Sequence, residues 1–227
     1  MLGVLYDIHG NLPALEAVLA DAEQAGVSRY VLGGDYALFG PWPYETVRRL
    51  RDLDAVWIRG NGERWTAAPA GAPDDELIGA AIEASREHLA GMADELARLP
   101  EQYVTGSARF CHASPLSDVR SFLPEPGDDE DELIAGAYEE RLVFGHTHVQ
   151  FRRPDAGGGI ELVNPGSVGM PFDGDPRAGY ALIADDGTLE LRRVEYDHEH
   201  SAAEVADRFP GFGETIARRI SQAAFEA

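Results

Sequence analysis

The stretch LGVLYDIHGNLPALEAVLADAEQAGVSRYVLGGD, residues 2–35, alternates strand-like and helix-like patterns. Residues 2–6 form a short apolar run that is typical of a buried strand. In residues 12–26 apolar side chains recur on one helical face, a proline lies in the first turn and a glycine ends the segment, which predicts a helix. Residues 29–35 predict a second strand that ends in a glycine turn. This β-α-β order predicts a parallel sheet with helices packed on it.

The remaining segments extend this start into one domain of the α/β class. In the first half we expect a second helix, a third strand and a long helical stretch, at residues 43–53, 55–61 and 74–98. The second half is rich in strand-like segments and predicts four or five more strands, with hairpin turns near Gly106–Ser107 and Asp186–Gly187. An acidic loop at 125–140 is expected to lead into a helix.

We therefore predict a single domain over residues 1–227. A helical insertion is expected at about 66–100, where it would form a partial lid near a site, and a helical tail at about 200–227.

Composition and charge narrow the classes of partner. The formal net charge of −21 argues against a broad face for nucleic acid or for a membrane surface, so we expect neither partner. The single cysteine rules out a disulfide framework within the chain. With no membrane-length apolar run and no signal-peptide pattern at the start, the sequence predicts a cytoplasmic protein. Nothing in it indicates an oligomeric state.

Polar residues that can bind metals follow the predicted strands. They occur in the segments DIH (7–9), GGD (33–35), GN (60–61), CH (111–112) and GHTH (145–148). Because ligands bind outside the carboxyl ends of strands in α/β sheets, we expect these side chains to meet at one edge. Carboxylate and imidazole groups are good ligands for first-row metals.

Each segment alone also has an ordinary structural interpretation. Asp7 could cap the following helix, GHTH could be a surface turn, and glycine followed by Asp or Asn is common in turns. The order of all five segments along alternating strands and helices is what favours a shared site.

Taken together, the motifs resemble the calcineurin-like metallophosphoesterase superfamily, in particular its small bacterial single-domain members. The resemblance runs from residue 2 to about 195 and rests on DIHGN (7–11), GGD (33–35), RGNGE (59–63), CHASP (111–115), GHTH (145–148) and NPGSVG (164–169).

The resemblance implies a fold, a cofactor and a set of ligands. The fold would be a four-layer α/β/β/α sandwich of two mixed β-sheets flanked by helices. Asp7, His9 and His148 would bind one divalent metal ion, Asn61, His112 and His146 a second, and Asp35 would bridge both. Manganese is the first expectation, and iron, zinc, nickel or cobalt would also suit this ligand set.

The implied activity is hydrolysis of a small-molecule phosphate ester or nucleotide. A hydroxide shared by the two metals would attack a phosphodiester, a phosphomonoester or a nucleotide phosphoanhydride. Asp35, Asn61 and His112 are the predicted catalytic residues. Two alternatives stay open: a dinucleoside-polyphosphate hydrolase, and a non-catalytic metal-binding scaffold for protein interactions. The presence of all seven ligand positions favours catalysis.

The chain departs from the family pattern at Gly62. Many members carry a histidine there, which is assigned to protonating the leaving group or to binding phosphate. A glycine can do neither, so we expect a substrate with a relatively acidic leaving group. Asn11, Arg59 and Arg64 are the candidate substrate contacts. The sequence after Gly34–Asp35 lacks the Asp-Arg-Gly of protein Ser/Thr phosphatases, which disfavours that activity.

Three further features have both a structural and a functional interpretation. Cys111 points to the opposite side of its strand from His112, so a buried structural thiol is favoured over a nucleophile. Trp42 and Trp65 follow site motifs and are candidate substrate walls. The segment HEH, residues 198–200, has no partner motif and is not expected to bind metal.

Overall fold

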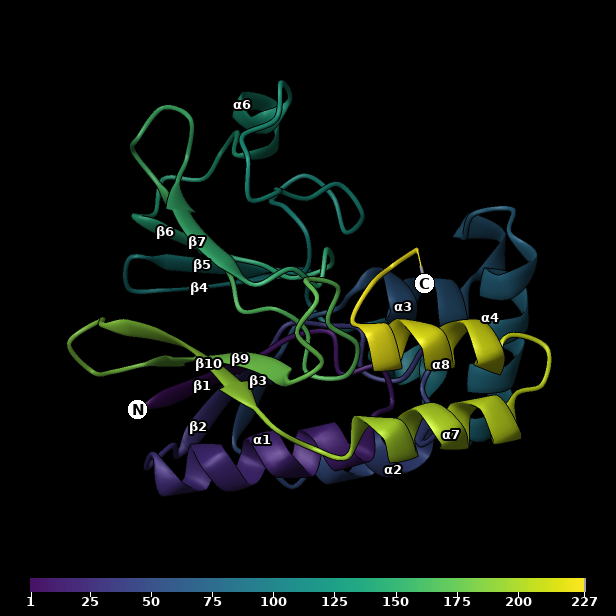
Figure 1. Cartoon of the computed structure of the whole chain (residues 1–227). Helices are drawn as coiled ribbons and strands as arrows, with labels where there is room; N and C mark the ends of the chain where they lie inside the picture. The colour runs from purple at the N-terminus through teal and green to yellow at the C-terminus, as the bar shows by residue number, and fades with distance from the viewer. Residues whose placement is uncertain (227) are drawn as a thin grey trace.

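Two five-stranded sheets pack face to face at the centre of the molecule (Figure 1). The computed structural model describes residues 1–226. Sheet A has the strand order β10-β9-β1-β2-β3 and sheet B the order β4-β5-β6-β8-β7. The strands of sheet A are β1 (Leu2–Leu5), β2 (Arg29–Leu32), β3 (Ala55–Trp57), β9 (Ala178–Ile183) and β10 (Leu189–Val194). Those of sheet B are β4 (Gln102–Thr105), β5 (Ala108–Cys111), β6 (Arg141–Val143), β7 (Phe151–Pro154) and β8 (Glu161–Asn164).

Both sheets mix parallel and antiparallel pairs. In sheet A, β1 pairs in parallel with β2, which pairs in parallel with β3, as the β-α-β start predicts. β9 returns antiparallel to β1 and forms the predicted hairpin with β10. In sheet B, β5, β6 and β8 are parallel, with β4 and β7 antiparallel at the edges. The carboxyl ends of the parallel strands carry the loops that build the site.

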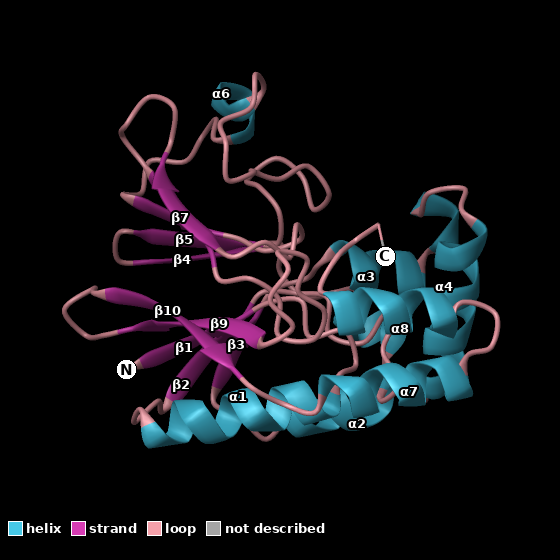
Figure 2. Cartoon of the chain, in the orientation of Figure 1, coloured by secondary structure: helices cyan, strands magenta, loops and turns pink. Residues whose placement is uncertain are grey.

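Helices flank the sheets and gather beyond one end of them (Figure 2). They are α1 (Leu12–Gln24), α2 (Pro43–Leu50), α3 (Asn61–Ala67), α4 (Glu76–His88), α5 (Ala93–Leu96), α6 (Glu130–Leu133), α7 (His198–Arg208) and α8 (Gly213–Gln222), with a 3₁₀ turn at Pro69–Gly71. Helices α1 and α2 run along the outer side of sheet A, and the short α6 lies outside sheet B. The arrangement confirms the predicted four-layer α/β/β/α class. Within residues 1–226 no helix has the length and apolar character needed to span a membrane.

Alternation along the strands separates a core between the two sheets from the cores on their outer faces. In β1 and the residue after it, Val4 and Tyr6 face the space between the sheets, whereas Leu5 packs in the cluster under the outer helices. In β6 the inner residue is Val143, while Leu142 packs outward beside Cys111. The central layer is therefore built from both sheets, and it fixes how their carboxyl ends meet.

One buried hydrogen bond joins the two sheets directly. The hydroxyl of Tyr6 donates to the carbonyl of Val143 at 3.0 Å, and the Tyr6 side chain is fully buried. A buried phenol usually needs such a partner, because an unpaired hydroxyl in an apolar core is costly. This bond sets β1 against β6, whose following loops carry the DIH and GHTH motifs.

The prediction of one continuous helical stretch at 74–98 is wrong. It is divided into α4 and α5 at Ala90 and Gly91, which have φ values of 50° and 87°. The division has a physical reason: Ala81 and Ile82 pack in a core with α7 and α8, whereas Met92 packs under sheet A. A single straight helix could not face both cores.

Two other boundaries differ from the sequence prediction. The third strand ends at Trp57, and residues 61–67 form helix α3, which was not expected. The helix predicted after the acidic loop is only the single turn α6. The C-terminal tail is helical and broken near FPGFG, as predicted.

Tyr6→Phe tests the bond between the sheets. The substitution leaves the Val143 carbonyl without this donor, and we expect the free energy of unfolding in urea to fall by about 1 kcal/mol. Tyr138→Phe is the matched control, because Tyr138 is 92% exposed and should leave stability unchanged. Equal stability of both variants would contradict a role for Tyr6 in joining the sheets.

Candidate metal centre

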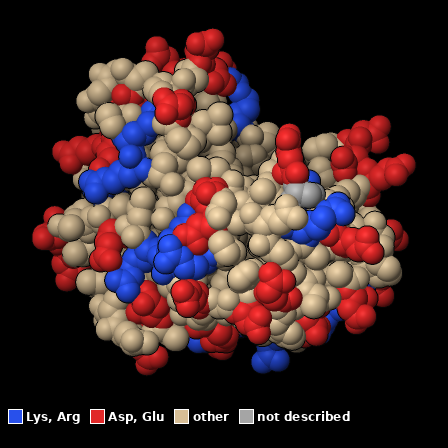
Figure 3. Space-filling model, in the orientation of Figure 1, with Lys and Arg blue, Asp and Glu red and all other residues tan. Residues whose placement is uncertain are grey.

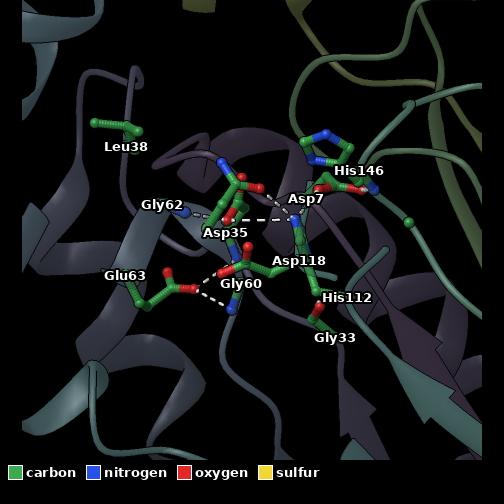
Figure 4. Close-up of polar contacts among 12 residues, drawn as sticks. Asp7, Gly33, Asp35, Leu38, Gly60, Gly62, Glu63, His112, Asp118 and His146 are labelled. Atoms are coloured by element: carbon green, nitrogen blue, oxygen red, sulfur yellow. Dashed lines mark hydrogen bonds and ion pairs between the residues drawn. The ribbon is translucent and has the colours of Figure 1, made fainter. Parts of the chain in front are cut away.

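Loops that follow five strands meet at the carboxyl ends of the two sheets. Asp7 and His9 follow β1, Asp35 follows β2, and Asn61 opens α3 after β3. His112 follows β5, and His146 and His148 follow β6. Figure 4 shows Asp7, Asp35, His112 and His146 turned toward one another. All seven are buried except His146, which is partly exposed. The structure thus brings together all seven side chains predicted as ligands.

Backbone hydrogen bonds connect these loops to each other. The amide of His9 donates to the carbonyl of Asp35 at 2.9 Å, and the amide of Gly145 donates to the carbonyl of His112 at 2.8 Å. The NPGSVG segment supports the first loop, since the Ser167 hydroxyl donates to the Asp7 carbonyl at 2.6 Å. The site therefore rests on a network that continues the strand pairing past the strand ends.

Backbone strain is concentrated in the same loops. Asp7, His9, Asp35, His146 and His148 all have positive φ values, between 48° and 69°. This left-handed region is unfavourable for residues other than glycine. Strained backbone of this kind clusters at functional sites, where the surrounding structure holds it in place. The geometry supports a functional role for these five residues.

Three imidazole rings are each oriented by a hydrogen bond at Nδ1, which leaves Nε2 turned into the site. The Nδ1 atoms of His9, His112 and His148 lie 2.8, 2.9 and 2.5 Å from the carbonyls of Leu38, Gly33 and Met170. A carbonyl can only accept, so each Nδ1 carries a hydrogen, and the neutral form of each ring has a lone pair at Nε2. Such a backbone partner is the usual way to orient a metal-binding histidine.

The first group of lone pairs lies around His9 and His148. Their Nε2 atoms are 3.0 Å apart, and Asp7 Oδ1 lies 3.5 Å from His148 Nε2. Asp7 Oδ1 is buried and has no hydrogen-bond partner among the described residues. Asp35 Oδ2 lies 3.8 Å from His9 Nε2. Acceptors that face one another in a buried space need a cation or a proton between them.

The second group lies around Asn61. Its Oδ1 is 2.9 Å from His112 Nε2, and the other oxygen of Asp35, Oδ1, is 3.5 Å from the same nitrogen. Turning the amide over would let its nitrogen donate to His112 Nε2 and to His146 Nδ1, each at 2.9 Å. With the amide oxygen in that position instead, acceptor atoms of Asn61, His112 and His146 converge, as ligands do around a metal ion.

Asp35 therefore presents one carboxylate oxygen to each group. In each of two sets of three residues, the ligand atoms lie within 4.8 Å of one another. One set is Asp7, His9 and His148, and the other is Asp7, Asp35 and His112. Asp7 Oδ1 thus lies within reach of both groups. Carboxylate oxygens with imidazole nitrogens and one amide oxygen form a donor set that fits first-row divalent cations.

The electrostatics agree with this fit at His9 and His146 but not at His112, where burial would lower the pKa and the charges of Asp35 and Asp7 raise it overall. Burial lowers the pKa of His9 and of His146 to about 3 each, which keeps both rings neutral. Burial alone would raise the pKa of Asp7, but the imidazoles around it, His148 first, lower it overall. Burial raises the pKa of Asp35 to about 7, and the nearby charges of Glu63 and Asp7 add to that rise. Two buried carboxylates that share one space account for this difference between Asp7 and Asp35.

Glu63 is a site residue that the sequence did not single out. Its buried carboxylate accepts hydrogen bonds from the amides of Asp35, Tyr36 and Gly60 at 2.8 to 2.9 Å. It thereby ties the loop after β2 to the loop after β3. Figure 4 shows Glu63 beside Asp35 and Gly60. In the sequence, Glu63 resembles any acidic residue in the first turn of a helix. Only the fold places it against Asp35.

Gly62 lies directly against Asp35. Its amide donates to Asp35 Oδ1 at 2.7 Å, and a Cβ at this position would lie 2.9 Å from that oxygen. A side chain here would therefore require Asp35 or the loop to move. The close approach of Asp35 therefore favours a glycine at position 62, and a glycine has no side chain that could donate a proton.

The three predicted substrate contacts differ in position. Asn11 is buried, and both donors and both acceptors of its amide are used by Gly169, Tyr196, Ala14 and Ser201. The prediction that Asn11 contacts substrate is therefore not supported by its position, since it has no polar group free.

Arg59 and Arg64 line a polar recess of about 300 Å³ beside His112. Arg64 forms two hydrogen bonds to the carboxylate of Asp118, at 2.6 and 2.7 Å, and Arg59 pairs with Glu101. Both charges are thus partly neutralised, although each guanidinium has further N–H donors.

The other residues singled out in the sequence are Cys111, the two tryptophans and the HEH segment. Cys111 is buried in the outer core of sheet B, and burial raises the pKa of its thiol, which fits a structural role. Trp65 lines the cavity over the site, whereas Trp42 packs against His200 and Arg208. His200 and the other residues of HEH belong to α7.

The chain is similar to known proteins over most of its length. The sequence profile of the calcineurin-like phosphoesterase superfamily domain matches residues 1–187. The chain belongs to this superfamily. Its members are metal-dependent, and the buried Asp and His groups of this chain could bind such metals.

Relatives cover most of the chain. An uncharacterized protein of Methanocaldococcus jannaschii is 30% identical over 219 residues, 87% of this chain and 88% of its own length. The phosphodiesterase YfcE of Escherichia coli is 28% identical over 190 residues, 79% of this chain and 85% of its own. A crystal structure of a metallophosphoesterase from Sphaerobacter thermophilus is 25% identical, with a TM-score of 0.83 and 98% of both chains covered.

Glu63→Gln tests how the Asp35 loop is held. Glutamine offers one acceptor oxygen, and its amide nitrogen would face a backbone N–H group. We expect the free energy of unfolding to fall by about 2 kcal/mol, the range for hydrogen bonds to a charged group. Glu87→Gln, at an exposed position of α4, is the control and should be neutral. A Glu63→Gln variant as stable as this control would show that the three hydrogen bonds are dispensable.

Proposed function

We propose that this protein is a phosphoesterase that uses two divalent metal ions. The observation that carries the proposal is Asp35, whose two oxygens face separate groups of lone pairs, toward His9 and toward His112. We assign Asp7, His9 and His148 to one ion and Asn61, His112 and His146 to the other, with Asp35 shared between them. Manganese is our first choice, and iron, zinc, nickel or cobalt would suit the same donors.

The residues of the chain would act mainly by holding and orienting. Cations held by these residues would supply a water nucleophile at neutral pH and positive charge for the phosphoryl oxygens. Asp35, Asn61 and His112, the predicted catalytic residues, would hold and orient those ions beside the reacting phosphoryl group. Glu63 would hold the Asp35 loop through its three backbone hydrogen bonds. Arg59 and Arg64 would contact the phosphoryl group through donors that Glu101 and Asp118 do not use.

The reaction would be hydrolysis of a small-molecule phosphate ester. The oxygen of water forms a bond to phosphorus, and the bond from phosphorus to the leaving oxygen breaks. The proton from water ends on the leaving oxygen or in solvent. Because Gly62 supplies no donor for that oxygen, we propose a substrate with a relatively acidic leaving group. A cytoplasmic location and a single-domain organisation remain predictions from the sequence.

Asp35→Asn tests the proposed activity with bis(p-nitrophenyl) phosphate and added Mn²⁺. Loss of one carboxylate charge that both ions share should lower kcat/KM by at least about 100-fold. Asp128→Asn, at an exposed position in the acidic loop, is the control and should keep full activity. No metal-dependent turnover of any phosphate ester by the native protein would favour the scaffold alternative.

The same assay tests the leaving-group hypothesis. Across aryl phosphates and bis(aryl) phosphates, we expect rates to fall steeply as the pKa of the leaving phenol rises. Equal rates across that range would contradict the inference from Gly62.

Metal affinity should depend on pH through Asp35. Its pKa of about 7 means that the carboxyl is largely protonated at about pH 6, and a cation must displace that proton. We therefore expect the Kd for Mn²⁺ to fall by up to about tenfold between about pH 6 and 7 and to change less above that. Calorimetric titration in buffers of different ionisation enthalpy counts the protons released. The Asp35→Asn variant should release fewer, and a Kd that does not vary with pH would argue against ligation by Asp35.

A further inference from the structure

A cavity of about 640 Å³ opens over the candidate metal centre. His9, Asp35, Asn61, His146 and His148 line one side of it. The remaining walls are mostly hydrocarbon and come from separate parts of the chain: Leu77 and Ile78 of α4, Val119 and Leu123 of the loop after β5, and Met170 and Phe172 after the NPGSVG motif. Any group attached to a phosphate at the centre must leave along these walls or through the polar recess beside His112.

The mouth of the cavity is apolar as well. Val119, Leu123 and Phe225 are 40%, 56% and 58% exposed, and all three line this cavity. The formal net charge of the chain is −21, and acidic side chains are spread over the face seen in Figure 3. Exposed apolar side chains gathered at one opening of such a surface mark a binding site rather than random exposure.

Most polar groups in the walls have partners within the chain; the Trp65 Nε1–H, which is buried and has no hydrogen-bond partner among the described residues, is an exception. Asp75 caps α4 by accepting from the Ile78 amide at 2.9 Å, and Ser121 donates to the carbonyl of Ala113 at 3.0 Å. The Arg219 guanidinium lies 4.2 Å from the centroid of the Phe225 ring and donates to its carbonyl. A nucleobase placed here would lose hydrogen bonds to water with few partners in return, whereas a hydrocarbon group would lose none.

We propose that the substrate is a phosphate ester with a hydrocarbon arm, alkyl or aryl, that lies in this cavity. The proposal rests on the proposed function, because the phosphoryl group must lie at the centre. The walls of α4 and of the 119–123 loop would select the arm, and Val119 and Leu123 would be specificity-determining residues. The nucleoside arm of a dinucleoside polyphosphate would be a poorer fit.

The test compares p-nitrophenyl phosphodiesters that differ only in the second arm: methyl, octyl, benzyl and 5′-thymidine. The leaving group and the chemical step are the same in all four, so differences in kcat/KM report binding of the arm. We expect the octyl or the benzyl ester to exceed the methyl ester by at least about tenfold, since apolar pockets discriminate by that much per buried group. Comparing octyl with benzyl separates an alkyl from an aryl preference.

Substitutions at the mouth assign the preference to the cavity. The double variant Val119→Thr with Leu123→Gln keeps side-chain size, removes apolar surface and affects only partly exposed positions. It should reduce the octyl-to-methyl or benzyl-to-methyl ratio of kcat/KM several-fold. Val104→Thr is the matched control, because Val104 is 47% exposed on β4, outside this cavity. It should leave every ratio unchanged.

The outcomes separate the two proposals. Equal turnover of all four esters, or a preference for the thymidine ester, would overturn the hydrocarbon arm and leave the phosphoesterase proposal standing. If no ester is turned over, the phosphoesterase proposal fails, and calorimetry with octylphosphonate and methylphosphonate tests the cavity alone. Tighter binding of octylphosphonate with a negative heat-capacity change, weakened in the double variant, would support an apolar ligand. Equal binding of the two phosphonates would overturn it.

Discussion

Lone pairs that cannot satisfy one another are the central constraint of this structure. His9 and His148 present nitrogens to each other at 3.0 Å, beside an oxygen of Asp7 that has no hydrogen-bond partner among the described residues. In a buried space such an arrangement is unfavourable unless positive charge lies among the acceptors. The fold nevertheless holds these groups in place, and the loops around them are organised to do so.

The surroundings supply that restraint at three levels. Backbone carbonyls fix three imidazole rings through Nδ1, and Glu63 fixes the Asp35 loop through its amides. The inter-sheet core, with the Tyr6–Val143 hydrogen bond, fixes the relative position of the loops. The left-handed backbone at Asp7 and Asp35 is the cost of turning both carboxylates inward. A site of this kind is preorganised, because little of it needs to rearrange when a ligand arrives.

Much of this could be predicted from the sequence, because strand ends are local signals. Apolar runs followed by Asp, Asn or His predicted which side chains would converge, and the β-α-β start predicted the sheet that brings Asp7 and Asp35 together. What depends on distant contacts could not be predicted. Glu63 is marked only by its neighbours in the fold, and Asn11 is satisfied by groups as far away as Ser201. The break at Ala90 reflects two cores competing for one apolar stretch, which periodicity alone does not reveal.

The single thiol of the chain has a practical consequence. Cys111 is buried in the outer core of sheet B, and its raised pKa makes it a poor nucleophile in the folded protein. A cysteine introduced at an exposed position would therefore be the reactive thiol that a labelling reagent meets first. Leu123, at the mouth of the cavity and 56% exposed, offers a place for a fluorescent reporter. Binding of a ligand at the centre could then be followed by fluorescence, without a measurement of turnover.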